Sequence, residues 1–133
     1  MYPVRESIQV MDGLTAFAAA PVNGAAGAPR TFYVTPLQAK GMILQCSIIG
    51  GTTFSLTFTI KAWDPYATTP AATATILASA AKTDNTGFNL YVAPGQLVVT
   101  NVATNYVMPD YWVLEITGTT DTAAIRVVAT YIP

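Results

Sequence analysis

Apolar and hydroxyl side chains alternate along residues 53–63, and a period of two predicts a β-strand that buries one face. The apolar positions, which we expect to face the core, are Phe54, Leu56, Phe58 and Ile60. Asp64-Pro65 follows, and proline ends a central strand because it has no backbone N–H to donate to the sheet. We therefore predict a central core strand from Thr53 to Trp63. Its hydroxyl face is either open to solvent or covered by a neighbour.

The preceding strand has the same period, which predicts that the two strands form a hairpin. A three-residue turn at Gly50-Gly51-Thr52 places Ile48 opposite Phe54 and turns Cys46 to the same apolar face. A two-residue turn would instead set apolar side chains opposite polar ones. The pattern therefore favours the longer turn.

A second hairpin is predicted near the C-terminus, where the chain folds back at residues 118–121. Pairing Thr117 with Thr122 collects the apolar side chains of both strands on one face. The same register makes Glu115 and Arg126 diagonal neighbours on the other face. We expect these two residues to form a surface ion pair.

Three further stretches, residues 73–81, 87–93 and 96–108, have strand-like sequences and are separated by turn residues. No stretch of more than about ten residues has the spacing of an amphipathic helix. About eight short strands with regular turns predict an all-β fold, an antiparallel β-sandwich of jelly-roll or immunoglobulin-like topology. Alternation alone does not choose between these two topologies.

Residues 1–35 contain a run of small residues and breakers, "AAAPVNGAAGAPR", which cannot supply a core layer. Short strand-like pieces occur in the same segment at Glu6–Met11 and Leu14–Ala19. We interpret residues 1–35 as an extended N-terminal arm or loop and residues 36–133 as the β-sandwich domain. Such an arm is expected to order against a neighbouring subunit, because alone it buries too little surface to offset its chain entropy.

The composition favours contact with other proteins. The chain of 133 residues is 52% hydrophobic and only 10% charged, whereas soluble domains carry about 25% charged residues. Surfaces rich in threonine and alanine suit burial against a partner. Because the net charge is -1 and Lys and Arg occur singly, we expect no nucleic-acid partner. No secretory signal and no apolar run of about 20 residues is readable, so no membrane partner is expected.

The residues that usually carry enzymatic chemistry are scarce. The chain has no histidine, so a Ser-His or Cys-His pair cannot activate a nucleophile. Most of its 7 acidic residues stand at predicted turns, where aspartate hydrogen-bonds to the backbone. The single Cys46 is expected in the core and cannot build a zinc site alone. We predict a protein that is not an enzyme and that binds no metal and no cofactor.

Aromatic residues are the remaining candidates for a site. Tyrosine and tryptophan can pack in a core, anchor a protein interface or stack on sugars, and their spacing does not choose among these roles. The candidates for an interface are Phe17, Tyr33, Trp63, Tyr66, Tyr106 and Tyr111.

Residues 53–132 resemble a group of small virion proteins of tailed bacteriophages. The similarity rests on three pieces in order, "SLTFTIKAWDP", "TATILASAAKTDNTGFNLYVAPG" and "NYVMPDYWVLEITGTTDTAAIRVVATYI". In that group a strand ends in Asp-Pro, as at Asp64-Pro65, and a turn like Tyr91–Gly95 follows a second strand. A tryptophan-bearing strand and a final hairpin close the chain.

The resemblance implies a structural protein of the virion, above all a capsid decoration (cement) protein. Such a protein is assembled in the host cytoplasm, binds the exterior of the head and bridges coat subunits. Its implied partners are the major capsid protein and copies of itself, with a trimer as a common form in that group. A neck or tail location is the nearest variant, and no catalytic residue comes with the resemblance. Read from the residues alone, a carbohydrate-binding β-sandwich is the alternative.

Overall fold

The computed structural model describes residues 6–13, 33–49, 54–66, 71–95, 101–104, 108–120 and 124–133. The regular structure in these ranges is β-strand, and none of it is helix, which confirms the predicted all-β class. A helix long and apolar enough to cross a membrane is therefore not found in this part of the chain.

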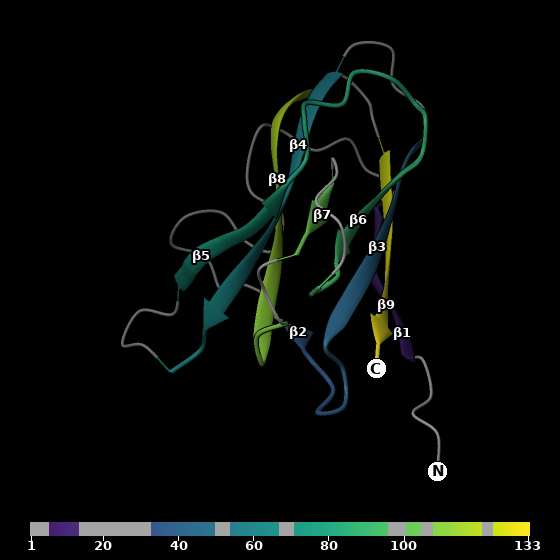
Figure 1. Ribbon diagram of the computed structural model, residues 1–133. Coiled ribbons are helices and arrows are strands. Elements are labelled where there is room, and N and C mark those ends of the chain that lie inside the picture. Colours follow the sequence, from purple (N-terminus) through teal and green to yellow (C-terminus); the bar gives the residue numbers. More distant parts are fainter. Residues whose placement is uncertain are drawn as a thin grey trace.

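The strands form two sheets that pack face to face (Figure 1). The strands of the described ranges are β1 (Glu6–Gly13), β2 (Tyr33–Val34), β3 (Gly41–Ile49), β4 (Phe54–Asp64), β5 (Ala71–Ala78), β6 (Phe88–Val92), β7 (Val102–Ala103), β8 (Tyr111–Thr120) and β9 (Ala124–Ile132). The five-stranded sheet has the order β1-β9-β3-β6-β7, and the four-stranded sheet has the order β2-β8-β4-β5. Neighbouring strands are antiparallel except β6 and β7, which are parallel.

The pairing follows one rule if β7, a strand of two residues, is set aside. Strands pair from the outside of the sequence inward: β1 with β9, β2 with β8, β3 with β6 and β4 with β5. The chain is thus doubled into an antiparallel ribbon, and rolling this ribbon brings β3 beside β9 and β4 beside β8. A rolled ribbon of eight strands in two sheets is a jelly roll. The strand order therefore selects the jelly roll over the immunoglobulin-like topology.

Both predicted hairpins are wrong for the same reason. Strand β3 lies in the five-stranded sheet and β4 in the four-stranded sheet, and β8 and β9 are divided in the same way. Each predicted pair of strands is therefore divided between the two facing sheets. In a hairpin, the apolar side chains of both strands lie on one face of the same sheet. In two facing sheets, the apolar side chains of each strand point across the core toward the other strand. Both arrangements need the same alternation of apolar and polar residues in the sequence. The predicted turn residues 50–52 and 121 lie outside the described ranges.

The prediction of which side chains face the core is confirmed. The side chains of the four longest strands that are buried in the core between the sheets are Met42, Leu44, Cys46 and Ile48, Phe54, Leu56, Phe58 and Ile60, Trp112, Leu114 and Ile116, and Ile125, Val127, Ala129 and Tyr131. Polar contacts also join the two sheets, because the Trp112 Nε1–H donates to the Tyr131 hydroxyl at 2.9 Å. A buried indole N–H needs such a partner. Strand β4 lies between β8 and β5, and it ends at Asp64 as the sequence predicts.

The described part of the segment predicted as an arm is strand. Residues 6–13 form β1, which pairs along its length with β9, and Tyr33 and Val34 form β2. Residues 14–32, which include the strand-like piece Leu14–Ala19, lie outside the described ranges. Two of the remaining predicted strands are confirmed as β5 and β6, and the described part of residues 96–108 contains β7.

Candidate interaction surface

Exposed apolar side chains gather at one end of the sandwich. Among the described residues, the large hydrophobic side chains that remain exposed are Val34 (60%), Tyr66 (82%) and the fully exposed Leu37. They lie where β4 ends, β8 begins and the turn between β2 and β3 passes (Figure 1). We call Val34, Leu37, Tyr66 and Tyr111 the end surface.

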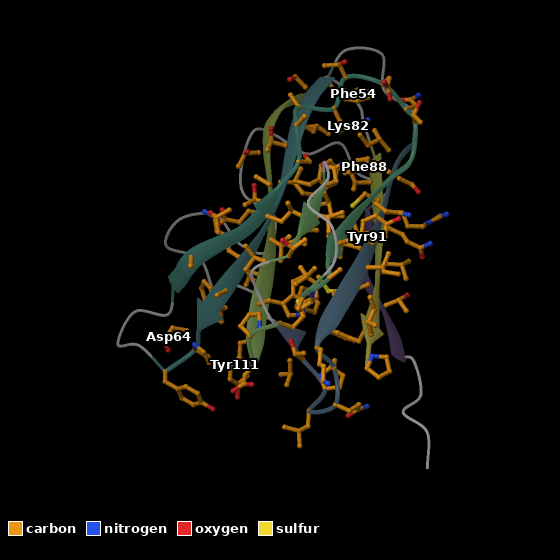
Figure 2. The ribbon with its side chains drawn as sticks, in the orientation of Figure 1. Phe54, Asp64, Lys82, Phe88, Tyr91 and Tyr111 are labelled. Carbon is orange, nitrogen blue, oxygen red and sulfur yellow. The ribbon has the colours of Figure 1, made fainter. Side chains whose placement is uncertain are left out.

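Tyr66 is positioned by the end of β4. Pro65 cannot continue the sheet, and the Asp64 carboxylate accepts a hydrogen bond from the Tyr66 backbone N–H at 2.9 Å. This turn brings Tyr66 beside Tyr111, the first residue of β8, and Figure 2 shows Asp64 and Tyr111 at this end. The two hydroxyl oxygens are 2.8 Å apart, and the rings meet edge to face at 81° with centroids 5.8 Å apart. A local turn therefore joins two strands that are distant in sequence.

Val34 and Leu37 lie on the side of Tyr111 that faces away from Tyr66, because β8 lies between β2 and β4. Val34 is the cross-strand partner of Tyr111, and the Thr35 N–H donates to the Asp110 carbonyl at 2.8 Å. The chain then turns, because the Ala39 N–H donates to the Pro36 carbonyl at 2.9 Å. Leu37 lies inside this turn, which leaves its side chain in solvent.

The surroundings of Tyr111 in the end surface favour its protonated hydroxyl. The hydrogen bond with Tyr66 raises the pKa of the Tyr111 hydroxyl above its usual value, and the negative charge of Asp110 acts in the same direction. A phenol is neutral near pH 7 even without such a shift. The surface is therefore apolar with neutral hydrogen-bonding groups, which is the chemistry that tyrosine brings to protein interfaces.

Two of the other candidate residues, Trp63 and Tyr33, have described side chains. Trp63 is 6% exposed, and Tyr33 packs its ring on Trp112 with centroids 4.9 Å apart. Trp63 therefore offers little area to a partner, whereas Tyr33 is partly exposed. Phe17 and Tyr106 lie outside the described ranges, so their role as interface residues stays a prediction.

The sequence reasoning missed Val34 and Leu37. A leucine directly after a proline, in a stretch without alternation, is the signal that could have identified Leu37, since a turn offers no core position. No comparable signal marks Val34. Its exposure depends on the pairing of β2 with β8, which joins residues far apart in the sequence.

The predicted ion pair between Glu115 and Arg126 is wrong, because β8 and β9 belong to different sheets. Glu115 instead contacts Lys61 of β4, with Nζ and Oε2 2.7 Å apart. In the register of β4 and β8, Lys61 lies opposite Val113 and Thr59 opposite Glu115, so the charged pair is diagonal.

The outer face of the four-stranded sheet is partly covered. Val113 and Glu115 alternate with the core residues of β8 and so lie on this outer face, yet they are only 1% and 9% exposed. Neither Val113 nor the buried Trp63 belongs to the core cluster between the sheets. The hydroxyl side chains of the same face, such as Thr57 and Thr59, are half-buried.

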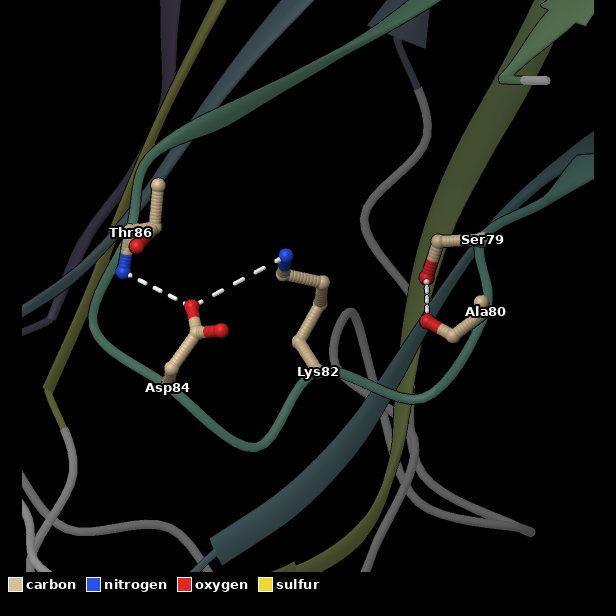
Figure 3. A network of polar contacts seen from close by, with 5 residues as sticks. All are labelled: Ser79, Ala80, Lys82, Asp84 and Thr86. Atoms are coloured by element: carbon tan, nitrogen blue, oxygen red, sulfur yellow. Dashed lines mark hydrogen bonds and ion pairs between the residues drawn. The ribbon is translucent and has the colours of Figure 1, made fainter.

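The loop between β5 and β6 lies at the opposite end of the sandwich, where Figure 2 labels Lys82, and Figure 3 shows its polar contacts. The Asp84 carboxylate accepts from the Thr86 N–H at 3.0 Å, and Lys82 Nζ lies 3.9 Å from the same oxygen. The pKa of Asp84 is lowered mainly by the hydrogen bonds from Thr86, with Lys82 adding to the effect. The Lys82 backbone bonds to Leu56 of β4, which fixes the loop to the sheet. Asp84, like Asp64, therefore supports a turn, as predicted for the turn carboxylates.

Cys46 is buried as predicted, with 2% of its surface exposed. Burial raises the pKa of its thiol from 9.0 to about 12, so the nucleophilic thiolate is disfavoured at neutral pH. In the part of the chain that the structure describes, no three Cys, Asp or Glu side chains come together as metal ligands.

Comparisons of this chain with protein-family models, with curated proteins and with solved structures found no match.

Proposed function

We propose that this protein is a structural component of a virus particle, namely a decoration (cement) protein on the exterior of a tailed-phage head. In this role it binds the major capsid protein, bridges coat subunits and associates with copies of itself. The observation that supports the proposal most directly is the end surface. It offers a partner apolar area and two tyrosines at one end of a molecule with few charges.

The energetics of the end surface favour binding over free exposure. Burying an exposed valine, leucine or tyrosine side chain contributes about 25 cal/mol for each Å² removed from water. Val34, Leu37 and Tyr66 each expose more than half of their area, and each is held by β-structure or a hydrogen-bonded turn. A surface that is already ordered loses little entropy on binding.

The fold is compatible with this proposal but does not select it. Jelly rolls occur in viral capsid proteins and in lectins, and a fold alone does not determine function. The resemblance of residues 53–132 to small virion proteins of tailed phages directs the proposal toward the virion. The low charge agrees with it, because a protein repeated across a shell is stabilised by many lateral contacts.

The first test is quantitative mass spectrometry of purified virus particles from the source, with this chain counted relative to the major coat protein. A ratio near one, or a simple fraction of it, is expected for a protein that covers the shell. A ratio of a few per cent would move the proposed location to the neck, tail or vertices. Absence from the particles would overturn the proposal.

The second test asks whether the end surface makes the contact. We expect Leu37→Asp to weaken binding to particles stripped of this protein, because the substitution places a charge in the apolar contact. Asn85→Asp is the matched control, since it adds the same charge in the exposed loop beside Lys82, at the opposite end in Figure 2. Equal binding of the two variants would exclude the end surface as the contact.

The exposed Tyr66 ring also favours a second candidate, a carbohydrate-binding module, because sugars stack on exposed aromatic rings. Trp63 cannot serve as the stacking platform in this structure, since it is 6% exposed. The discriminating measurement is a glycan array with the unmodified protein and with Tyr66→Ala. Sugar binding that depends on Tyr66, together with absence from particles, would replace the virion proposal with this one.

A further inference from the structure

Tyr66 and Tyr111 form a pair with a geometry suited to covalent chemistry. Their hydroxyl oxygens are 2.8 Å apart although the residues are 45 positions apart in the sequence. The ring centroids are 5.8 Å apart, and the ring of Tyr66 is 82% exposed. The two rings are therefore in contact with each other and open to a reagent in solvent.

We propose that Tyr66 and Tyr111 are a site of oxidative modification, at which a haem peroxidase with hydrogen peroxide joins the two rings as an intramolecular dityrosine. The inference depends only on the geometry of the pair. It goes beyond the proposed function and is independent of it.

The chemistry balances as follows. Each phenol loses one electron and one proton and becomes a phenoxyl radical, whose unpaired electron is shared with the Cε carbons on either side of the hydroxyl. The two radicals couple to form a Cε–Cε bond, and both rings regain aromaticity by moving the hydrogen of each joined carbon to its oxygen. One molecule of hydrogen peroxide accepts the two electrons and two protons and yields two molecules of water.

The geometry favours coupling within the pair over other reactions. Because the hydroxyls touch, the Cε carbons beside them are already close, and the exposed Tyr66 ring has room to turn its edge toward Tyr111. Reactants held in contact react at effective concentrations far above those of separate molecules in solution. The other tyrosines with described side chains are engaged elsewhere: Tyr91 accepts a hydrogen bond from Asn89, Tyr33 packs on Trp112, and Tyr131 is buried.

The test oxidises the chain of 133 residues at high dilution with a haem peroxidase and hydrogen peroxide, followed by trypsin digestion and mass spectrometry. Cleavage after Lys61, Lys82 and Arg126 releases peptides 62–82 and 83–126, and Tyr66 is the single tyrosine of the first peptide. We expect the two peptides to appear joined, with the loss of two hydrogen atoms and with fragment ions that place the bond at Tyr66 and Tyr111. The yield per chain should not depend on protein concentration.

Three variants distinguish the proposed pair from general tyrosine oxidation. Tyr66→Phe and Tyr111→Phe should each abolish the joined peptide and the dityrosine fluorescence. Tyr91→Phe, which removes a tyrosine hydroxyl from the same peptide as Tyr111, should leave both signals unchanged. Circular dichroism of each variant checks that it is folded.

Several results would overturn the proposal. One is a bond from Tyr66 to Tyr91 or Tyr106, and another is a joined peptide that persists in Tyr111→Phe. A product found only between chains, with a yield that rises with protein concentration, would also overturn it. So would the absence of dityrosine while the same reaction mixture couples a free tyrosine peptide.

Discussion

Strand β3 begins with Gly41, at a position where a side chain does not fit. A Cβ atom on Gly41 would collide with the backbone carbonyl oxygen of Val92 on the neighbouring strand β6. Because backbone in the middle of a sheet cannot move aside cheaply, a larger residue must push the two strands apart.

We therefore expect Gly41→Ala to lower the free energy of unfolding by about 1–3 kcal/mol, as overpacking of a core usually does. Urea denaturation measures this difference. Gly87→Ala is the control, because its added Cβ would meet the Cys46 carbonyl oxygen at an ordinary 3.5 Å. This control should change stability by less than about 0.5 kcal/mol. Equal effects of the two substitutions would contradict the close approach at Gly41.

A second prediction at this scale concerns the pH dependence of stability. The Cys46 thiol has a pKa of about 12 in the folded protein, raised from 9.0 by burial. The unfolded chain therefore releases this proton first, so the stability present below about pH 9 is lost as the pH rises toward 12. The slope contributed by this group is up to about 1.4 kcal/mol per pH unit. Urea denaturation at a series of pH values should show a steeper alkaline decline for the native chain than for Cys46→Ala, and parallel curves would contradict it.

The burial of individual side chains could be predicted from the sequence in part. Alternation identified the buried faces of four strands correctly, because burial on a strand follows the period of two. It did not distinguish Trp63, which is buried, from Tyr66, which is exposed three residues later. Both stand at the end of β4, and their exposure depends on strands that the sequence does not place next to them.

At the scale of elements, the ion pair of Lys61 and Glu115 links the neighbouring strands β4 and β8. Their side chains are 29% and 12% exposed, so water screens the pair only in part. We expect a double-mutant cycle with Lys61→Met and Glu115→Gln to give a coupling energy of roughly 0.5–3 kcal/mol, the range for residues in direct contact.

The matched control is the cycle of Lys82→Met and Asp84→Asn, at a separation of 3.9 Å in an exposed loop. A smaller coupling energy is expected there, since Asp84 is 64% exposed and solvent screens its attraction to Lys82. Chemical denaturation of the four variants in each cycle provides both values. Zero coupling for Lys61 and Glu115 would show that the diagonal contact adds nothing to stability.

The sequence did not predict which strands pair with each other, as the two predicted hairpins show. Residues 42–48 and 54–60 have matching apolar faces, and this match is satisfied either by lateral pairing or by contact across the core. The structure uses the second arrangement. The choice between the two arrangements depends on whether the chain between the strands turns within one sheet or crosses to the other sheet. The alternation of apolar and polar residues is the same in both cases.

At the scale of the whole molecule, β1 and β9 have unequal roles in the same sheet. Strand β9 lies between β1 and β3, whereas β1 is at the edge of the sheet, with β9 as its one neighbour among the described strands. We expect deletion of residues 124–133 to abolish the cooperative thermal transition seen by far-ultraviolet circular dichroism. The removal leaves the facing edges of β1 and β3 without a hydrogen-bonded partner and takes the buried Ile125 and Val127 out of the core.

Deletion of residues 1–13 is the comparison. It removes an edge strand and should lower the midpoint of the thermal transition while the transition stays cooperative. If the truncation at residue 123 melted with an unchanged midpoint, the central position of β9 would be wrong.

The sandwich as a whole could be predicted because short alternating strands with frequent turns leave few other architectures. The jelly-roll order could not, since it is a property of contacts between distant segments such as β1 with β9. The end surface depends on the same long-range order. Tyr66 and Tyr111 were both candidates from their residue type, but their hydrogen bond requires β4 and β8 to be neighbours.

The ribbon-like pairing has a consequence for synthesis on the ribosome. Strand β3 lies between β6 and β9, so one of its edges has no partner until β9 has emerged from the ribosome. Contacts between strands this far apart in sequence also make folding slow, on the order of milliseconds to seconds for β-sandwiches. The nascent chain therefore carries an unpaired edge of β3 during the synthesis of the residues between β3 and β9. A chaperone that shields such edges would act on this protein in the interval before β9 emerges.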